Sequence, residues 1–99
     1  MKIEFDRNDF KRSEEFYGLI QNAFNLPEWF GKNADALWGA LTGFVKTPCT
    51  ITFKNFTQKE NNYNERNINL ILNCFVDAEK NIQINLLFYL NNSLQTNNH

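Results

Sequence analysis

The sequence contains little of what most enzymes use. It has one histidine, His99, which stands in a polar stretch at the end of the chain, where nothing would hold it as a general base or a metal ligand. The four glycines are scattered and form no phosphate-binding loop. These absences argue against the common hydrolases and against cofactor-dependent enzymes. We therefore expect no catalytic residues, no metal ion and no cofactor.

Charge of one sign and long hydrophobic runs are also missing. Ten Lys and Arg against eleven Asp and Glu give a net charge of −1, whereas a nucleic-acid-binding protein needs a positive excess to neutralise phosphates. No run approaches the roughly 18 apolar residues of a membrane-spanning helix. Residues 1–6 lack the hydrophobic stretch of a signal peptide. We expect neither nucleic acid nor a membrane as partner, and we expect a cytoplasmic protein.

Cysteine is scarce, and its spacing is uninformative. Cys49 and Cys74 have no partner at the spacing of metal ligands, and without a secretion signal we expect both to be reduced, packed thiols. With 42 % hydrophobic and 15 % aromatic residues, a chain of 99 residues can bury one core without a disulfide. We predict a single domain over residues 1–90 and a polar, frayed C-terminal tail over residues 91–99.

Hydrophobic periodicity predicts strands separated by helices. We expect Ser13 to begin and cap the first helix, Asn33 to cap the second, and a short helical turn around Phe56. The last strand is apolar on both sides, which is typical of a strand covered on both faces. The predicted strands are residues 2–5, 49–53 and 82–90, and the predicted helices are residues 13–24, 34–43 and 65–80. This order indicates a single small α/β domain with a three-stranded parallel sheet packed against helices.

The segment over residues 26–48 carries more information than its apolar spacing alone. If Ala34, Leu37, Trp38 and Leu41 point inward, a second helical stripe of Asp35, Gly39 and Thr42 faces water or a partner.

Three aromatic residues flank this stripe. Trp29 and Phe30 precede the helix, and Phe44 follows its glycine end. Large aromatic side chains in loops and at helix ends form interface hot spots, but they also fill the core of a small domain. Both interpretations are open from spacing alone.

The motif in this segment resembles the signature of the barstar family of intracellular ribonuclease inhibitors. The resemblance rests on Leu26-Pro27-Glu28-Trp29-Phe30-Gly31, Asn33, Asp35-Ala36-Leu37-Trp38, Leu41-Thr42-Gly43 and Pro48. It implies a small protein with a three-stranded parallel sheet that forms a 1:1 complex with a bacterial extracellular-type ribonuclease, or a related toxin, and blocks its active site. The second helix and the loop before it would enter the nuclease cleft.

The resemblance also implies a partner-binding surface. Asp35 matches a contact acid of the family, and Asp77, on the long helix, matches a second acid through a looser correspondence. Gly39 occupies a further position of this surface. The remaining implied contact residues are Trp29, Asn33, Trp38, Thr42, Gly43 and Phe44.

Two positions depart from the family pattern. Gly39 stands where the family has an aspartate that mimics a phosphate, and Lys32 stands where it has a glutamate. A glycine inside a helix costs about 1 kcal/mol relative to alanine. Close approach of a partner's backbone or a neutral loss of function at this position would explain the glycine. Glu28 or Asp77 could supply the missing negative charge.

Three classes of function are therefore weighed. The first is a barstar-like inhibitor or immunity protein of a bacterial ribonuclease. The second is a barstar-fold binding module or antitoxin for a different, non-barnase partner, which Gly39 and Lys32 favour. The third, an enzyme, has the least support because histidine and cofactor motifs are absent.

Overall fold

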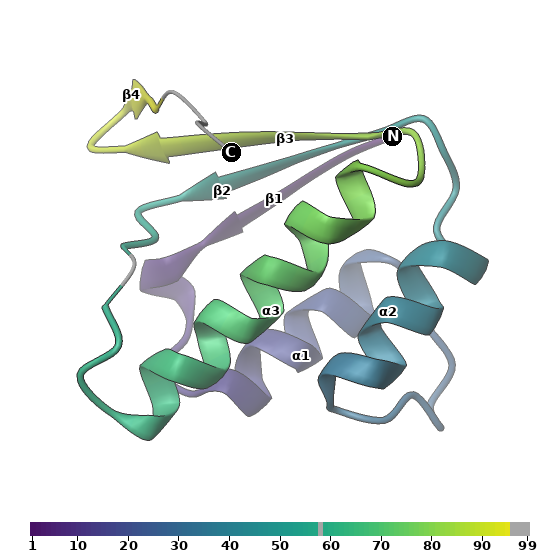
Figure 1. The fold of residues 1–99 in the computed structure, drawn as a ribbon, viewed down its shortest axis with the longest axis horizontal. Coiled ribbons are helices and arrows are strands. Elements are labelled where there is room, and N and C mark those ends of the chain that lie inside the picture. The colour runs from purple at the N-terminus through teal and green to yellow at the C-terminus, as the bar shows by residue number, and fades with distance from the viewer. Residues whose placement is uncertain (58, 96–99) are drawn as a thin grey trace.

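The described residues form a four-stranded sheet and three α-helices. Figure 1 shows the helices packed on one face of the sheet. The structure is a computed structural model, and it describes residues 1–57 and 59–95. The strands are β1 (Lys2–Asp6), β2 (Cys49–Lys54), β3 (Ile84–Leu90) and β4 (Ser93–Leu94), in the order β1-β2-β3-β4. Strands β1, β2 and β3 run parallel, while β4 pairs antiparallel with β3.

The helices form a second layer below the sheet. They are α1 (Ser13–Ala23), α2 (Ala34–Gly43) and α3 (Tyr63–Glu79), and a single 3-10 turn, η1 (Arg7–Asp9), follows β1. Helix α3 packs against β3, and both α1 and α2 pack against α3. Helix α2 therefore lies at the outer side of the helical layer, where one of its faces is free (Figure 1).

The core between the layers is dominated by phenylalanine. Phe5, Phe53 and Phe75 come from β1, β2 and α3, and all three are buried. The ring of Phe53 lies 5.9 Å from that of Phe5 and 5.2 Å from that of Phe75, between ring centroids. Contacts of this kind add to the free energy that burial of the rings already supplies. The core thereby fixes α3 on the sheet, and α3 in turn carries α2.

The prediction of three parallel strands is wrong, because the sheet has a fourth, antiparallel strand. Strand β4 lies in the segment that we expected to be a frayed tail, and Leu90 pairs with Ser93 across a two-residue loop. Both loop residues, Asn91 and Asn92, have positive φ, at 51° and 64°. Asparagine tolerates this left-handed conformation, which a tight hairpin turn requires at both positions. Residues 96–99, including His99, lie outside the described residues.

Strand β3 is not covered on both faces as predicted. All three helices lie on one side of the sheet, so Leu87 and Tyr89 on the other side are only partly buried (Figure 1). In the apolar run that suggested double coverage, only Ile84 and Leu86 are buried, and the four residues from Leu87 to Leu90 are half-buried.

Two local predictions are also wrong. Phe56 lies in no helical turn: Asn55 adopts a positive φ of 63° directly after β2, and Phe56 then packs between the rings of the core. Ser13 does not cap α1, because it is the first helical residue and its N–H donates to Asn64 Oδ1 at 2.9 Å. The cap position belongs to Arg12, whose N–H donates to Glu15 Oε1.

The cysteines agree with the prediction of reduced thiols. Both Cys49 and Cys74 are free, the first buried and the second half-buried. Burial raises the pKa of the Cys49 thiol above its ordinary value. Within the described ranges, no helix has the length and apolar character needed to cross a membrane.

Candidate functional site

Helix α2 begins at the cap that the sequence predicted. Asn33 has extended backbone, and its Oδ1 accepts a hydrogen bond from the N–H of Ala36 at 2.8 Å. This bond satisfies one of the free N–H groups of the first turn and sets the start of the helix. Leu37, Ala40 and Leu41 are buried below the helix, which fixes its rotation about its own axis.

The opposite side of α2 presents the residues implied by the resemblance. Asp35, Gly39, Thr42 and Gly43 are all exposed. Trp38, which the spacing placed inward, is instead 38 % exposed and lies at the margin of the buried stripe. Ala40 is buried instead, together with Leu37 and Leu41.

Exposed aromatic residues adjoin this side. Trp29 is 76 % exposed and Phe44 is 56 % exposed, and their rings meet edge to face with centroids 6.1 Å apart. Phe30, next to Trp29 in the same loop, is buried and packs near Tyr17. The two interpretations of these aromatics are thus divided by residue: Phe30 belongs to the core, and Trp29 and Phe44 face solvent.

The exposed polar groups of α2 differ in their freedom to bind. The Thr42 hydroxyl donates to the carbonyl oxygen of Trp38 at 2.8 Å, so its proton is used inside the helix. Asp35 has no hydrogen bond or ion pair with any residue that the structure describes. Its carboxylate is available to a partner.

A second carboxylate approaches from α3. Cys74, on the α3 face that contacts α2, lies with its Sγ 3.8 Å from the carbonyl oxygen of Ala34. Burial raises the pKa of Cys74, and the negative charges of Asp77 and Asp35 raise it further. Asp77 follows Cys74 by three residues on α3, so it lies on the same side of that helix as the contact of Cys74 with α2. Asp77 too is exposed, with no side-chain partner among the described residues.

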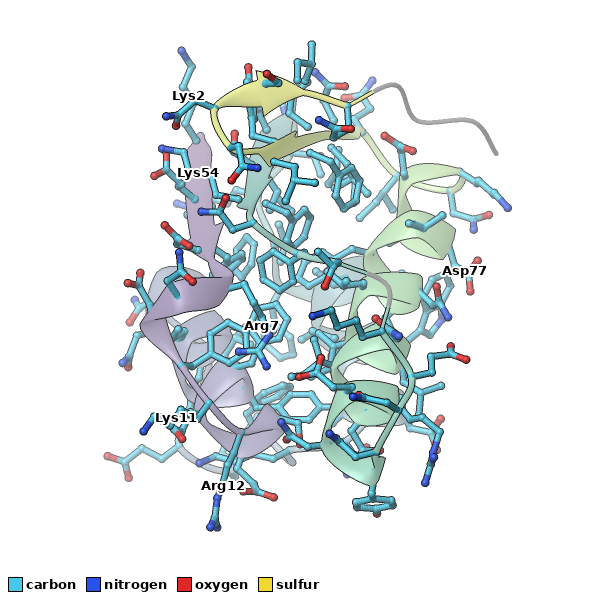
Figure 2. All side chains as sticks on the ribbon, turned by 90° about the vertical axis from the view of Figure 1, so that its left-hand side faces the viewer. Lys2, Arg7, Lys11, Arg12, Lys54 and Asp77 are labelled. Atoms are coloured by element: carbon cyan, nitrogen blue, oxygen red, sulfur yellow. The ribbon has the colours of Figure 1, made fainter. Side chains whose placement is uncertain are left out.

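The charged residues near this surface nearly balance. Glu28, Asp35 and Asp77 carry negative charge, while Lys32 and Lys46 carry positive charge. Figure 2 shows other basic side chains away from Asp77: Lys2, Lys54, Lys11 and Arg12 lie at the left of the view, Arg7 lies near its middle, and Asp77 projects from α3 at the right. Two of those cations are already paired, Arg7 with Glu65 at 2.7 Å and Lys54 with Glu4 at 2.9 Å.

The predicted site residues are therefore brought together with different roles. Trp29, Asp35, Trp38, Gly39, Thr42, Gly43 and Phe44 lie on one exposed side of α2 and at its ends, Asp77 joins them from α3, and Asn33 supports the helix as its cap. The spacing of residues in the sequence did not predict the contact between Cys74 and the start of α2. Among the described residues, no group of three or more His, Cys, Asp or Glu side chains is placed to hold a metal ion. An exposed surface of this kind suits binding of a macromolecule more than catalysis on a small-molecule substrate.

This exposed side and the fold that carries it agree with the comparison to known proteins. The sequence model of the family described as Barstar (barnase inhibitor) matches residues 1–91. The chain belongs to the Barstar family, as its motif predicted, and members of this family are inhibitors, not enzymes.

A curated relative points in the same direction. The chain is 40 % identical over 55 residues to the protein named "Putative ribonuclease inhibitor YrdF" of Bacillus subtilis (strain 168). The match covers 56 % of this chain and 60 % of that relative, so it spans less than two thirds of either protein.

Proposed function

We propose that this protein binds a bacterial ribonuclease in a 1:1 complex and blocks its active site through α2 and the loop before it. The family and the name of the Bacillus subtilis relative support inhibition of a ribonuclease. The observation that carries the choice of surface is the exposed group of Trp29, Trp38 and Phe44 beside the unpaired carboxylates of Asp35 and Asp77.

The physical basis is the chemistry of a nuclease cleft. An RNA-binding cleft is lined with Arg and Lys, so carboxylates steer association toward it and suppress wrong partners. Exposed tryptophan and phenylalanine side chains bury large areas at little cost in conformational entropy, which makes them the residues that dominate interface energies. We propose that the inhibitor acts inside the cell that produces the nuclease, as a cytoplasmic immunity protein.

The test is a calorimetric titration of this protein into a barnase-type ribonuclease at low and at high salt. Tight 1:1 binding that weakens as salt rises is the expected result, and nuclease activity should fall in proportion to the complex formed. Asp9→Asn, on the exposed η1, is the matched control for Asp35→Asn. Equal binding by Asp35→Asn, Trp29→Ala and the parent protein would show that another surface is used.

A second function is favoured by Gly39 and Lys32. These residues remove negative charge from a surface whose charges nearly balance, so the partner could be a protein other than a barnase-type nuclease. If the partner is such a protein, we expect the parent protein not to bind a barnase-type ribonuclease, and we expect Gly39→Asp to restore that binding. A Cβ atom added at Gly39 would meet nothing within 4 Å beyond its chain neighbours and the adjacent backbone of α2, so the helix has room for the substitution.

A further inference from the structure

An open cavity of about 310 Å³ lies along the first half of α3 and the loop before it. This volume is at the lower end of the range of small-molecule binding sites. The residues that line it are Glu60, Tyr63, Arg66, Asn67, Asn69, Leu70 and Asn73. None of them belongs to the surface proposed to bind a ribonuclease, so that function leaves the cavity without a role.

One buried side chain in this lining lacks a hydrogen-bond partner. Asn69 is only 7 % exposed, and its Nδ2 donates to the carbonyl oxygen of Lys59 at 3.0 Å. This bond fixes the orientation of the amide, because turning it over would place Oδ1 against the carbonyl oxygen of Lys59. The Oδ1 atom of Asn69 is buried and accepts no hydrogen bond from any described residue. A buried acceptor without a donor is costly, so a ligand that brings an N–H group would relieve that cost.

Two residues of opposite charge in the lining are also unpaired. Glu60 and Arg66 are exposed, and neither side chain has an ion pair or hydrogen bond with any residue that the structure describes. A guanidinium group binds a carboxylate through two parallel hydrogen bonds, and a carboxylate binds an ammonium group. Glu60 would repel a phosphate ester, and an uncharged ligand would leave both charges unused. The lining therefore favours a ligand that carries one positive and one negative group.

The cavity also has an apolar part. Tyr63 is 73 % exposed and Leu70 is 52 % exposed. They are seven residues apart, which places them on the same side of α3, about two turns from each other. Apolar surface of this kind becomes favourable when a ligand removes it from water.

We propose that this cavity binds a free α-amino acid with an apolar side chain. The α-carboxylate pairs with Arg66, and the α-ammonium group donates to Glu60 and to Oδ1 of Asn69. The apolar side chain of the ligand packs on Tyr63 and Leu70. An α-amino acid combines these three groups in a molecule small enough for this volume. The site is independent of the proposed inhibition of a ribonuclease.

The first test is a titration of the parent protein with L-phenylalanine and with L-leucine, followed by the NMR chemical shifts of the backbone amides. We expect saturable shifts for at least one of the two amino acids, concentrated in residues 60–73. L-phenylalaninamide lacks the carboxylate and N-acetyl-L-phenylalanine lacks the ammonium group. Each should bind at least about tenfold more weakly than L-phenylalanine. The proposal is overturned if neither amino acid gives saturable shifts there, or if either derivative binds as tightly as L-phenylalanine.

The second test removes the cation that would hold the carboxylate. Arg66→Gln should weaken binding of the amino acid at least about tenfold. Lys80→Gln is the matched control, because Lys80 is an exposed cation at the other end of α3, and it should leave binding unchanged. Both positions are exposed, so thermal melts should show that both variants remain folded. Equal binding by Arg66→Gln and the parent, or equal losses in the two variants, would contradict the site, and either result leaves inhibition of a ribonuclease untouched.

Discussion

Trp29 leaves most of its indole in solvent, although the protein has an aromatic core that could have received it. An exposed tryptophan contributes little to the stability of the free protein. Its apolar surface becomes favourable when a partner removes it from water. Trp29 can therefore contribute to binding of a partner while contributing little to the stability of the free protein.

Replacing Trp29 by alanine should therefore weaken the complex without unfolding the inhibitor. We expect a loss of about 2 kcal/mol or more in binding free energy, the level that defines an interface hot spot, with Tm unchanged. Tyr63→Ala is the control, because Tyr63 is 73 % exposed and lies at the start of α3. Calorimetry and thermal melts of both variants check this, and equal losses from both would contradict it.

Asp6 has a different role, since its contacts lie within the fold. Its Oδ1 accepts from the N–H of Asn8 at 3.0 Å and from Asn55 Nδ2 at 3.2 Å. These bonds, the one from Asn8 first, lower the pKa of Asp6 below its ordinary value of 3.8. The folded state therefore holds fewer protons than the unfolded state. The stabilisation is present above that ordinary value and is lost as the pH falls through the lower folded value.

Asp6→Asn should make the stability less sensitive to acid. Denaturant unfolding at several pH values between about 6 and 3 should show a shallower fall in the free energy of unfolding than the parent shows. Asp9→Asn, which changes a neighbouring exposed carboxylate, should retain the parent's slope. Identical slopes for Asp6→Asn and the parent would rule out this contribution.

At the level of elements, the loop before α2 and the start of α2 depend on each other. A Cβ atom on Gly31 would lie 3.0 Å from Nδ2 of Asn33, whose Oδ1 caps α2. The amide must shift to accept the extra carbon, and the shift costs part of the cap. Gly31 thus protects the geometry that orients Asp35 and Trp38.

Gly31→Ala should therefore destabilise the protein through the cap. We expect Gly31→Ala and Asn33→Ala each to lower the free energy of unfolding by about 1 kcal/mol, with the double variant losing less than the sum. Urea melts of the four proteins in this cycle measure the coupling. Additive losses would show that Gly31 acts independently of Asn33.

The β3–β4 hairpin is a second element whose geometry rests on particular residues. Asn92 has a φ of 64°, which alanine adopts at a cost of about 1 kcal/mol and glycine at none. Asn92→Ala should lower the free energy of unfolding by about that amount, and Asn92→Gly should preserve or raise it. Chemical denaturation of the two variants checks the prediction, and it fails if the glycine variant is the less stable of the two.

At the scale of the whole molecule, the net charge is only −1, so the ion pairs decide which charges remain free to act on a partner. Asp35 and Asp77 have no side-chain partner among the described residues, whereas Arg7 and Lys54, away from Asp77 in Figure 2, are paired with Glu65 and Glu4. Unpaired carboxylates can attract a basic partner even when the overall charge of the protein is small.

The rate constant for association should depend on the charges of Asp35 and Asp77. Asp35→Asn and Asp77→Asn should each lower the rate constant for association with a barnase-type ribonuclease and reduce its dependence on salt. Glu14→Gln, an exposed acid in the first turn of α1, should alter neither quantity. Stopped-flow fluorescence at several salt concentrations measures both. A change confined to the dissociation rate would argue against long-range steering.

Local patterns determined much of this molecule. The cap at Asn33 and the helix after it, the strand over residues 49–53 and the long third helix all followed from spacing, and the motif over residues 26–48 identified the family. These features depend on residues close in sequence, so a single sequence holds their signal. The hairpin was missed because its signal was a pair of asparagines in a stretch that reads as a polar tail.

Only the tertiary structure decided which candidate residues are exposed together. Trp29 and Phe30 are adjacent and both aromatic, yet one faces solvent and the other is buried near Tyr17. Asp35 and Asp77 are 42 positions apart and lie on two helices, α2 and α3, that pack against each other. Burial in a loop and proximity between helices depend on which elements cover which faces. Periodicity within one segment carries no record of that arrangement.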